Sequence, residues 1–278
     1  METYINNSPN KGLSFLYNTI IGRIMLKPMV SSKFISNTVA FVLNKKLSTI
    51  IIKPFINKVG INIDDYEKNR YDSFNDFFTR KIKSEKRVIN LQKSAFISPC
   101  DSKVSCYKIN NGLTVNIKNS KYSVASIISD KTIAKEYKNG YLLVFRLSVE
   151  DYHHYCFIDE GVIDKTYKIS GKFHTVNPIV YDKYQVFKEN TREVTLISTK
   201  NFDKVIYVEV GALMVGKITN IKTRGDFSKG EEKGYFEFGG STVVLLVKNL
   251  IQIDDLILNN TKKGKETCVK YGEKIGEK

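Results

Sequence analysis

The sequence is poor in the residues that mark disulfide scaffolds, zinc sites and membrane-spanning helices. Its 278 residues include four scattered cysteines, none in a Cys-x-x-Cys pair. We therefore expect free thiols in a reducing compartment and no metal site. No run approaches the roughly 18 to 20 apolar residues of a membrane-spanning helix. The first twelve residues are polar, and Arg23 and Lys27 interrupt the first apolar segment, so we expect no secretion signal.

Acidic residues are scarce, above all at the beginning of the chain. The 44 Lys+Arg outnumber the 29 Asp+Glu, which gives a net charge of +15, and Glu2 is the sole acid in residues 1–60. This charge predicts an anionic partner, either nucleic acid or an anionic lipid surface, and composition does not separate the two. A hydrophobic content of 42% with 26% charged residues excludes a disordered chain.

Large apolar residues recur at three- and four-residue spacing through the same basic stretch, as at Phe15, Ile20 and Ile24. The spacing predicts two or three amphipathic helices, punctuated by Pro28 and Pro54. Such helices can lie in a membrane interface with Lys and Arg toward anionic headgroups. They can also form an ordinary helical cap on the domain, and the two roles are compatible.

From about Ser94 the chain changes to short β-rich runs separated by Gly, Asn and Asp. We predict an α+β protein with a mainly-β barrel or sandwich core and N-terminal amphipathic helices. Residues 1–93 form the basic helical region and residues 94–278 the β-rich domain. The last stretch, 248–278, ends in a Lys/Glu/Gly-rich tail, 262–278, that is expected to fray. The predicted strands are 104–109, 113–117, 140–147, 155–158, 162–169, 193–198, 205–210, 215–221 and 241–247.

The chain has three histidines, and two of them adjoin in the segment DYHHYC, residues 151–156. Neighbours on a strand point to opposite faces, so His153 and His154 share a site only if the strand bends. Clustering in a chain otherwise nearly free of histidine favours a functional role over a structural one. A zinc site built on His153 and Cys156 lacks a third and a fourth ligand at suitable spacing.

Two turn-like segments have both a structural and a chemical interpretation. Asp101 follows Pro99 directly before a strand, where its carboxylate can simply bond the turn. Gly239-Gly240-Ser241 lies between apolar strands and suits an ordinary hairpin. A glycine before a serine also leaves its carbonyl open to attack by the serine hydroxyl, and it permits a strained peptide geometry.

Taken in order, eight short segments resemble the phosphatidylserine decarboxylase proenzymes, in particular their clostridial-type bacterial branch. The resemblance covers about residues 71–248, with a looser similarity in the N-terminal helices. The segments are FNDFFTR (74–80), SPCDS (98–102), DYH (151–153), GKFHTVNP (171–178), NTR (190–192), VGALMVG (210–216), KGE (229–231) and FGGST (238–242).

The resemblance implies a self-processing enzyme. Ser241 attacks the carbonyl of Gly240, and β-elimination cuts the chain into a β chain, 1–240, and an α chain, 241–278, whose first residue becomes a pyruvoyl group. The pyruvoyl carbonyl condenses with the amine of phosphatidylserine and accepts the electron pair released as CO₂ leaves, which yields phosphatidylethanolamine. Neither pyridoxal phosphate nor a metal is expected. The implied partners are phosphatidylserine, an anionic membrane surface and the two fragments as an α/β heterodimer, whose further dimerisation is left open. The implied location is the cytoplasmic side of the cell membrane, as a peripheral protein.

The family uses an Asp–His–Ser relay to activate the serine. Asp101 matches its aspartate and His153 the first histidine of the family pattern Asp-Tyr-His-Arg-x-His. Cys156 stands where the second histidine is common, and that second histidine usually has the relay role. His153 is our preferred base, with His154 and His174 as alternatives. Cys156 could act as a thiolate only with a depressed pKa.

Two further readings remain open. The missing second histidine is compatible with an uncleaved relative that serves as a lipid-binding scaffold. A basic β-barrel that binds nucleic acid would explain the charge. The chain lacks an RNP-type or helix-turn-helix signature, however, and its charge is strongest on helices interleaved with large apolar residues.

Overall fold

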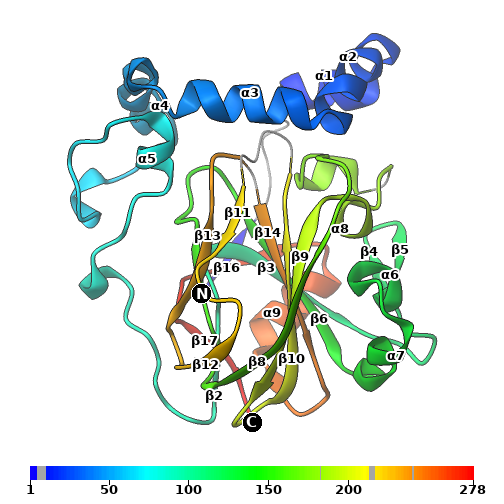
Figure 1. Cartoon of the computed structure of the whole chain (residues 1–278). Coiled ribbons are helices and arrows are strands. Elements are labelled where there is room, and N and C mark those ends of the chain that lie inside the picture. Colours follow the sequence, from blue (N-terminus) through cyan, green and yellow to red (C-terminus); the bar gives the residue numbers. More distant parts are fainter. Residues whose placement is uncertain (5–10, 182, 213–216, 240) are drawn as a thin grey trace.

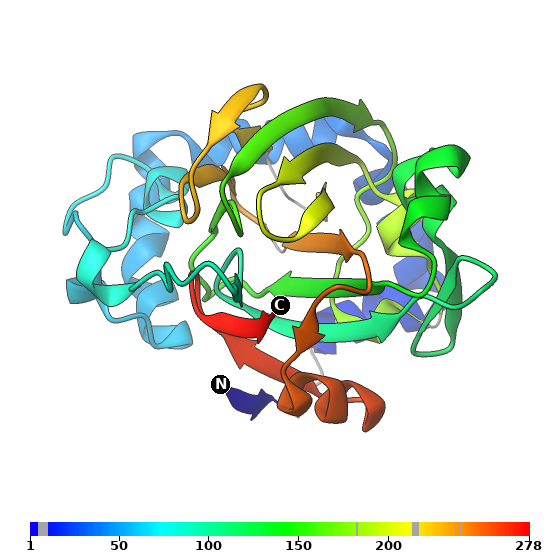
Figure 2. The same ribbon diagram turned by 90° about the horizontal axis from the view of Figure 1, so that it is seen from below.

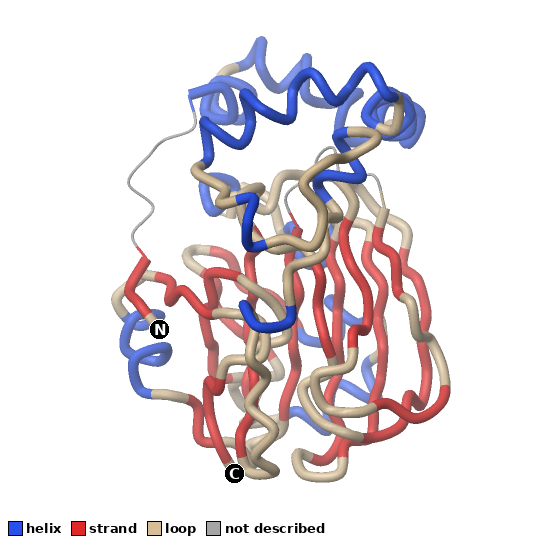
Figure 3. Tube along the Cα trace, turned by 90° about the vertical axis from the view of Figure 1, so that its left-hand side faces the viewer, coloured by secondary structure: helices blue, strands red, loops and turns tan. Residues whose placement is uncertain are grey.

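A computed structural model describes residues 1–4, 11–181, 183–212, 217–239 and 241–278. Helices occupy most of the first sixty residues, as predicted, and they lie across one end of a large sheet (Figures 1 and 3). They are α1 (Lys11–Asn18), α2 (Ile20–Ser31), α3 (Lys33–Leu43), the 3₁₀ helix η1 (Lys46–Ile51) and α4 (Ile52–Val59). Thr19 caps α2 by accepting a hydrogen bond from the Gly22 backbone. Gly60, in the left-handed conformation, ends α4.

The main sheet is antiparallel and has nine strands in the described part of the chain. In spatial order they are β1 (Glu2–Tyr4), β16 (Glu266–Val269), β3 (Ser102–Lys108), β6 (Tyr141–Leu147), β14 (Ser241–Val247), β10 (Asp203–Val210), β9 (Arg192–Thr199), β8 (Gly161–Ile169) and β12 (Gly225–Phe227). The chain combines helices with a large antiparallel sheet, so the predicted α+β class is confirmed. The nine-stranded sheet is open, so the core is not a closed barrel. Seen from below, β8 and β9 arch away from β3 and β6 (Figure 2).

Smaller elements complete the β-rich part. One sheet consists of β11 (Ile218–Asn220), β13 (Glu232–Phe236) and β7 (His154–Cys156), and another of β15 (Gln252–Ile253), β17 (Lys274–Glu277) and β2 (Ala95–Ile97). β4 (Thr114–Ile117) and β5 (Ser120–Ser123) form a hairpin. The remaining helices are η2 (Ile63–Asp65), α5 (Phe74–Phe78), η3 (Ser84–Lys86), α6 (Val124–Ile128), α7 (Lys131–Ala134), η4 (Lys135–Tyr137), η5 (Pro178–Val180), α8 (Val186–Glu189) and α9 (Asp255–Lys262).

The central strand β14 is buried on both of its faces. Val243, Leu245 and Val247 pack into one hydrophobic core, and Val244 and Leu246 pack into another on the opposite face. This double burial explains why residues 241–247 read as a nearly continuous apolar run. The strand predicted there is confirmed over the same residues.

The C-terminal tail, 262–278, is folded, and the prediction that it frays is wrong. It contains β16 and β17, and Ile275 is fully buried. β16 pairs with β3 in the main sheet. The Lys/Glu/Gly-rich composition was misleading because the few apolar residues of the stretch are spaced to face the core. Another predicted strand, 215–221, appears as β11, while residues 213–216 lie outside the described part.

None of the helices in the described ranges is long and apolar enough to cross a membrane.

Candidate active site

Ser241 and His153 meet in the interior of the protein. Ser241 begins β14, where it is paired with Leu147 of β6, and its side chain is fully buried. His153 directly precedes β7 and is also fully buried. The Nδ1 atom of His153 lies 3.2 Å from the Oγ atom of Ser241. The hydroxyl and the imidazole are therefore at hydrogen-bonding distance.

A backbone carbonyl determines which ring nitrogen of His153 carries the proton. Nε2 lies 3.0 Å from the carbonyl oxygen of Ser148, which can only accept a hydrogen bond, so Nε2 must donate. Burial lowers the pKa of His153 well below its usual range, and the nearby Arg80 guanidinium lowers it further. The ring is therefore neutral, and Nδ1 is free to accept the hydrogen of the Ser241 hydroxyl. This is the arrangement that a general base requires.

The turn at residues 148–151 holds that carbonyl in place. The Asp151 carboxylate accepts a hydrogen bond of 2.7 Å from the Ser148 backbone N–H. Lys103 donates to Asp151 at 2.7 Å and to Glu150 at 3.0 Å, while Arg80 donates to the Glu150 carbonyl at 3.4 Å. Two cations thus brace the turn that orients His153.

Aromatic rings form the wall beside His153. The Phe78 ring centroid lies 4.2 Å from that of His153, and Phe238 packs edge-on against Phe78 at 5.2 Å. Asn75 of the same helix, α5, accepts a hydrogen bond from the Phe238 backbone N–H. The segment that leads to Ser241 is thereby attached to α5. Gly239 has a φ of 134°, which favours glycine, and Gly240 lies outside the described residues.

The ring wall was not predicted as part of the site. Its residues Asn75, Phe78 and Arg80 belong to the segment FNDFFTR, one of the eight segments that carry the family resemblance. Sequence spacing gives no indication that this segment packs against residues some 75 positions further on.

Asp101 does not join His153. Its carboxylate forms a two-pronged ion pair with Arg87, accepts a hydrogen bond of 2.9 Å from the Tyr271 backbone and lies 3.5 Å from the Lys270 ammonium. No histidine is among its partners in the ranges that the structure describes. The relay role of Asp101 stays a prediction, and the geometry gives its carboxylate an anchoring role for the C-terminal segment.

The alternative bases lie elsewhere. His154 points away from Ser241: its Nδ1 lies 2.6 Å from Glu232, and its ring stacks on Tyr152 and Tyr235. His174 stacks on Tyr184, on the side of the protein that contacts α1.

Cys156 is fully buried, and burial raises the pKa of its thiol to about 12. It therefore remains a thiol at neutral pH, so the geometry offers no support for a thiolate base. Across the described segments, no group of three or more His, Cys, Asp or Glu side chains is arranged to hold a metal ion.

Comparison with known proteins gives a consistent result. The family model described as phosphatidylserine decarboxylase matches residues 74–277. A phosphatidylserine decarboxylase proenzyme 2 of Clostridium acetobutylicum is 50% identical over 275 residues, which cover 99% of this chain and 94% of the relative. A phosphatidylserine decarboxylase proenzyme of Clostridium botulinum strain 657 is 42% identical, with 96% and 93% covered, and one of Clostridium tetani is 42% identical, with 98% and 93% covered.

Proposed function

Because the chain belongs to the phosphatidylserine decarboxylase family, we propose that it converts phosphatidylserine to phosphatidylethanolamine after cutting itself between Gly240 and Ser241. The observation that carries this proposal is the contact of 3.2 Å between Nδ1 of His153 and Oγ of Ser241, in the tautomer that accepts a proton. A serine hydroxyl is a weak nucleophile until a base removes its proton.

In the proposed cleavage, His153 Nδ1 takes the hydroxyl proton as Ser241 Oγ attacks the carbonyl carbon of Gly240. The C–N bond between the two residues breaks, and the imidazolium returns the proton to the departing nitrogen. The product is an ester between Gly240 and the Ser241 oxygen. Removal of the Cα proton of residue 241 then expels the Gly240 carboxylate. Water replaces the nitrogen of the resulting unsaturated residue, with release of ammonia, and leaves a pyruvoyl group.

The residues around position 241 suit that group. The pyruvoyl carbonyl supplies the electron sink for loss of CO₂, so no pyridoxal phosphate is needed. His153 faces residue 241 and can hold, at Nδ1, the proton that the product carbon needs. The Phe78 and Phe238 rings exclude water on this side, and an apolar wall favours a step in which a carboxylate loses its charge.

The two fragments would stay together after cleavage. The α chain, 241–278, would begin with β14, which is hydrogen-bonded to β6 on one side and β10 on the other. It would also contribute β16 and β17, each paired with a strand of the β chain. An α/β heterodimer is therefore the proposed mature form, and the division into a helical region, 1–93, and a catalytic domain, 94–278, remains part of the proposal.

The N-terminal helices have a surface suited to a membrane. Ile20, Ile24, Leu47 and Ile50 are 68 to 88% exposed on α2 and η1. Basic residues such as Arg23 and Lys27 are exposed on the same helices. We propose that these helices dock on anionic lipid as a peripheral anchor at the cytoplasmic side of the cell membrane.

Asn75 connects these helices to the site. Its side-chain amide donates a hydrogen bond to Asn44, the residue that follows α3, and accepts one from the backbone N–H of Phe238, three residues before Ser241. The helices therefore also cap the domain, which is compatible with a role at the membrane.

The two alternative functions, an uncleaved lipid-binding scaffold and a nucleic-acid-binding protein, are less favoured, because the similar proteins are decarboxylase proenzymes.

One experiment tests the proposed processing. A denaturing gel with intact-mass analysis of the purified protein should give two fragments that correspond to residues 1–240 and 241–278, the smaller with a blocked N-terminus. A single full-length chain without decarboxylase activity would favour the uncleaved scaffold instead.

A further inference from the structure

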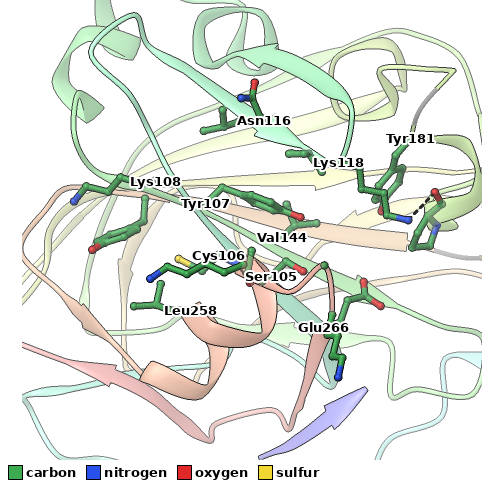
Figure 4. A pocket seen from close by; sticks show the side chains of 18 of the residues that line it. Ser105, Cys106, Tyr107, Lys108, Asn116, Lys118, Val144, Tyr181, Leu258 and Glu266 are labelled. Atoms are coloured by element: carbon green, nitrogen blue, oxygen red, sulfur yellow. Dashed lines mark hydrogen bonds between the residues drawn. The ribbon is translucent and has the colours of Figure 1, made fainter. Parts of the chain in front are cut away.

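A cavity lies away from Ser241, between β3, β6 and the β4–β5 hairpin. It has a volume of about 900 Å³ and is enclosed by β3, β6, the β4–β5 hairpin and the end of α9 (Figure 4). Val144 lines the cavity and belongs to the hydrophobic core on one face of the sheet. Leu147, the strand partner of Ser241, belongs to the core on the opposite face, so the cavity and the Ser241 site are on different faces. A cavity of this size is typical of sites for small molecules.

Four lysines surround the cavity without a compensating acid. They are Lys108, Lys118, Lys262 and Lys265. Within the described ranges, no carboxylate lies within 4.0 Å of these four ammonium groups. Lys108 donates to the Asn249 side chain and Lys118 to the Pro178 carbonyl, both of which are neutral.

Among the described residues that line the cavity, the one acid, Glu266, is already paired with a cation. Glu266 receives two hydrogen bonds from the guanidinium of Arg146, at 2.9 and 2.5 Å. Elsewhere in the protein, Lys103, Lys233 and Lys248 each lie within 3.0 Å of a carboxylate. The unpaired lysines therefore produce a local positive field that favours an anion with several charges.

Flat rings accompany these charges. The Nζ atom of Lys108 lies 4.2 Å from the centroid of the Tyr141 ring, and that of Lys118 lies 5.7 Å from the Tyr181 ring. Figure 4 shows the two lysines on opposite sides of the cavity, with Tyr107 and Val144 between them. An anion held by a lysine would thus place the group attached to it against an aromatic or apolar wall.

We propose that this cavity is a second binding site, separate from the Ser241 site, for a soluble organic polyphosphate that contains a planar ring, of the nucleoside di- or triphosphate type. The multiple charge satisfies the lysines, and the ring occupies the wall of tyrosines. A membrane-bound ligand fits less well, because the exposed apolar side chains Ile20, Ile24, Leu47 and Ile50 gather on α2 and η1, at the end of the protein that those helices cover.

The test is calorimetric titration of the wild-type protein with ATP, with pyrophosphate as the phosphate part alone and adenosine as the ring part alone. ATP should bind saturably and at least tenfold more tightly than either part. The double variant Lys262→Glu/Lys265→Glu should lose at least tenfold in ATP affinity. The matched control, Lys135→Glu/Lys138→Glu, has the same spacing and charge change at exposed positions outside the cavity, and should bind ATP as the wild type does.

Tyr141→Ala separates the two halves of the proposal, because it should weaken ATP binding while the affinity for pyrophosphate is retained. Thermal melts establish that each variant is folded. The proposal is overturned if ATP does not bind saturably, if the two double variants lose affinity equally, or if pyrophosphate binds as tightly as ATP.

Discussion

The Nδ1 atom of His153 faces the Oγ atom of Ser241 at 3.2 Å, while the Nε2 atom of the same ring is bound to the carbonyl of Ser148 at 3.0 Å. The contact with Ser148 determines which way the proton moves in the contact with Ser241, because a neutral ring that donates through Nε2 can only accept through Nδ1. The residues that hold the turn at 148–151 are therefore part of what makes Ser241 reactive.

Replacement of Ser241 by alanine should leave one chain of 278 residues. The variant lacks the hydroxyl that would attack Gly240, so neither the two fragments nor decarboxylase activity should form. Intact-mass analysis checks the cleavage, and circular dichroism checks that the variant is folded. If the alanine variant still splits at this bond, the serine is not the nucleophile and the proposed chemistry fails.

The three histidines should differ sharply. His153→Ala removes the base that contacts Ser241, so we expect self-cleavage to slow by roughly 10²-fold or more. His154→Ala should cleave normally with some loss of stability, because it breaks the contact with Glu232. His174→Ala should also cleave normally. Timed denaturing gels of freshly synthesised protein measure all three, and a block confined to His174→Ala would move the base to the segment 171–178.

Asp101→Asn distinguishes an anchor from a relay acid. The substitution leaves Arg87 without its charged partner, so we expect the free energy of unfolding to fall by about 1 to 3 kcal/mol in urea titrations. Cleavage should proceed at the wild-type rate, because the carboxylate does not touch His153. A folded Asp101→Asn protein that stays uncut would instead support the relay that the family resemblance implies.

Self-cleavage should remain efficient in mildly acidic solution. Its rate requires neutral His153, so it should be constant above the pKa of His153 in the folded protein and fall as the pH drops through that value. Burial and Arg80 lower this pKa well below the ordinary value of about 6.5. Stability should also decrease as the pH falls below about 6.5, since the unfolded chain then binds a proton that the folded one does not.

Substitution of Arg80 tests the electrostatic part of this prediction. Arg80→Met removes the positive charge and should shift the acid limb of the cleavage rate to higher pH, while Arg80→Lys should keep it near the wild-type position. If the cleavage rate falls at the same pH in the wild type and both variants, burial alone lowers the pKa of His153.

Membrane binding should have two separable parts. Arg23→Glu/Lys27→Glu should weaken binding to vesicles that contain anionic lipid by about tenfold or more, since each basic residue contributes about 1 kcal/mol near such a surface. Ile20→Ser/Ile24→Ser should instead remove the fraction that remains bound at high salt. Vesicle sedimentation at low and high salt measures both, and equal binding of the wild type to anionic and neutral vesicles would contradict the electrostatic part.

Local sequence patterns were sufficient to predict a large part of the secondary structure and the family. Helical spacing among basic residues indicated the N-terminal helices, and the apolar run at 241–247 indicated β14, because both signals arise from neighbours along the chain. Eight ordered segments were enough to identify the family. The Lys/Glu/Gly-rich C-terminus shows where composition fails, since its burial depends on strands β3 and β2, which lie far away in the sequence.

The site itself was decided by tertiary structure. His153 and Ser241 are 88 residues apart, and no local pattern states which of three histidines reaches the serine. Asp101, placed by its motif in the relay, contacts Arg87 and the Tyr271 backbone, and no local pattern predicts these partners from segments before and after it in the chain. The sequence determined which chemical groups are present and which elements they begin or end. Only the packing of those elements decided which groups touch, because burial and hydrogen bonding between distant segments select one arrangement among those that the local signals allow.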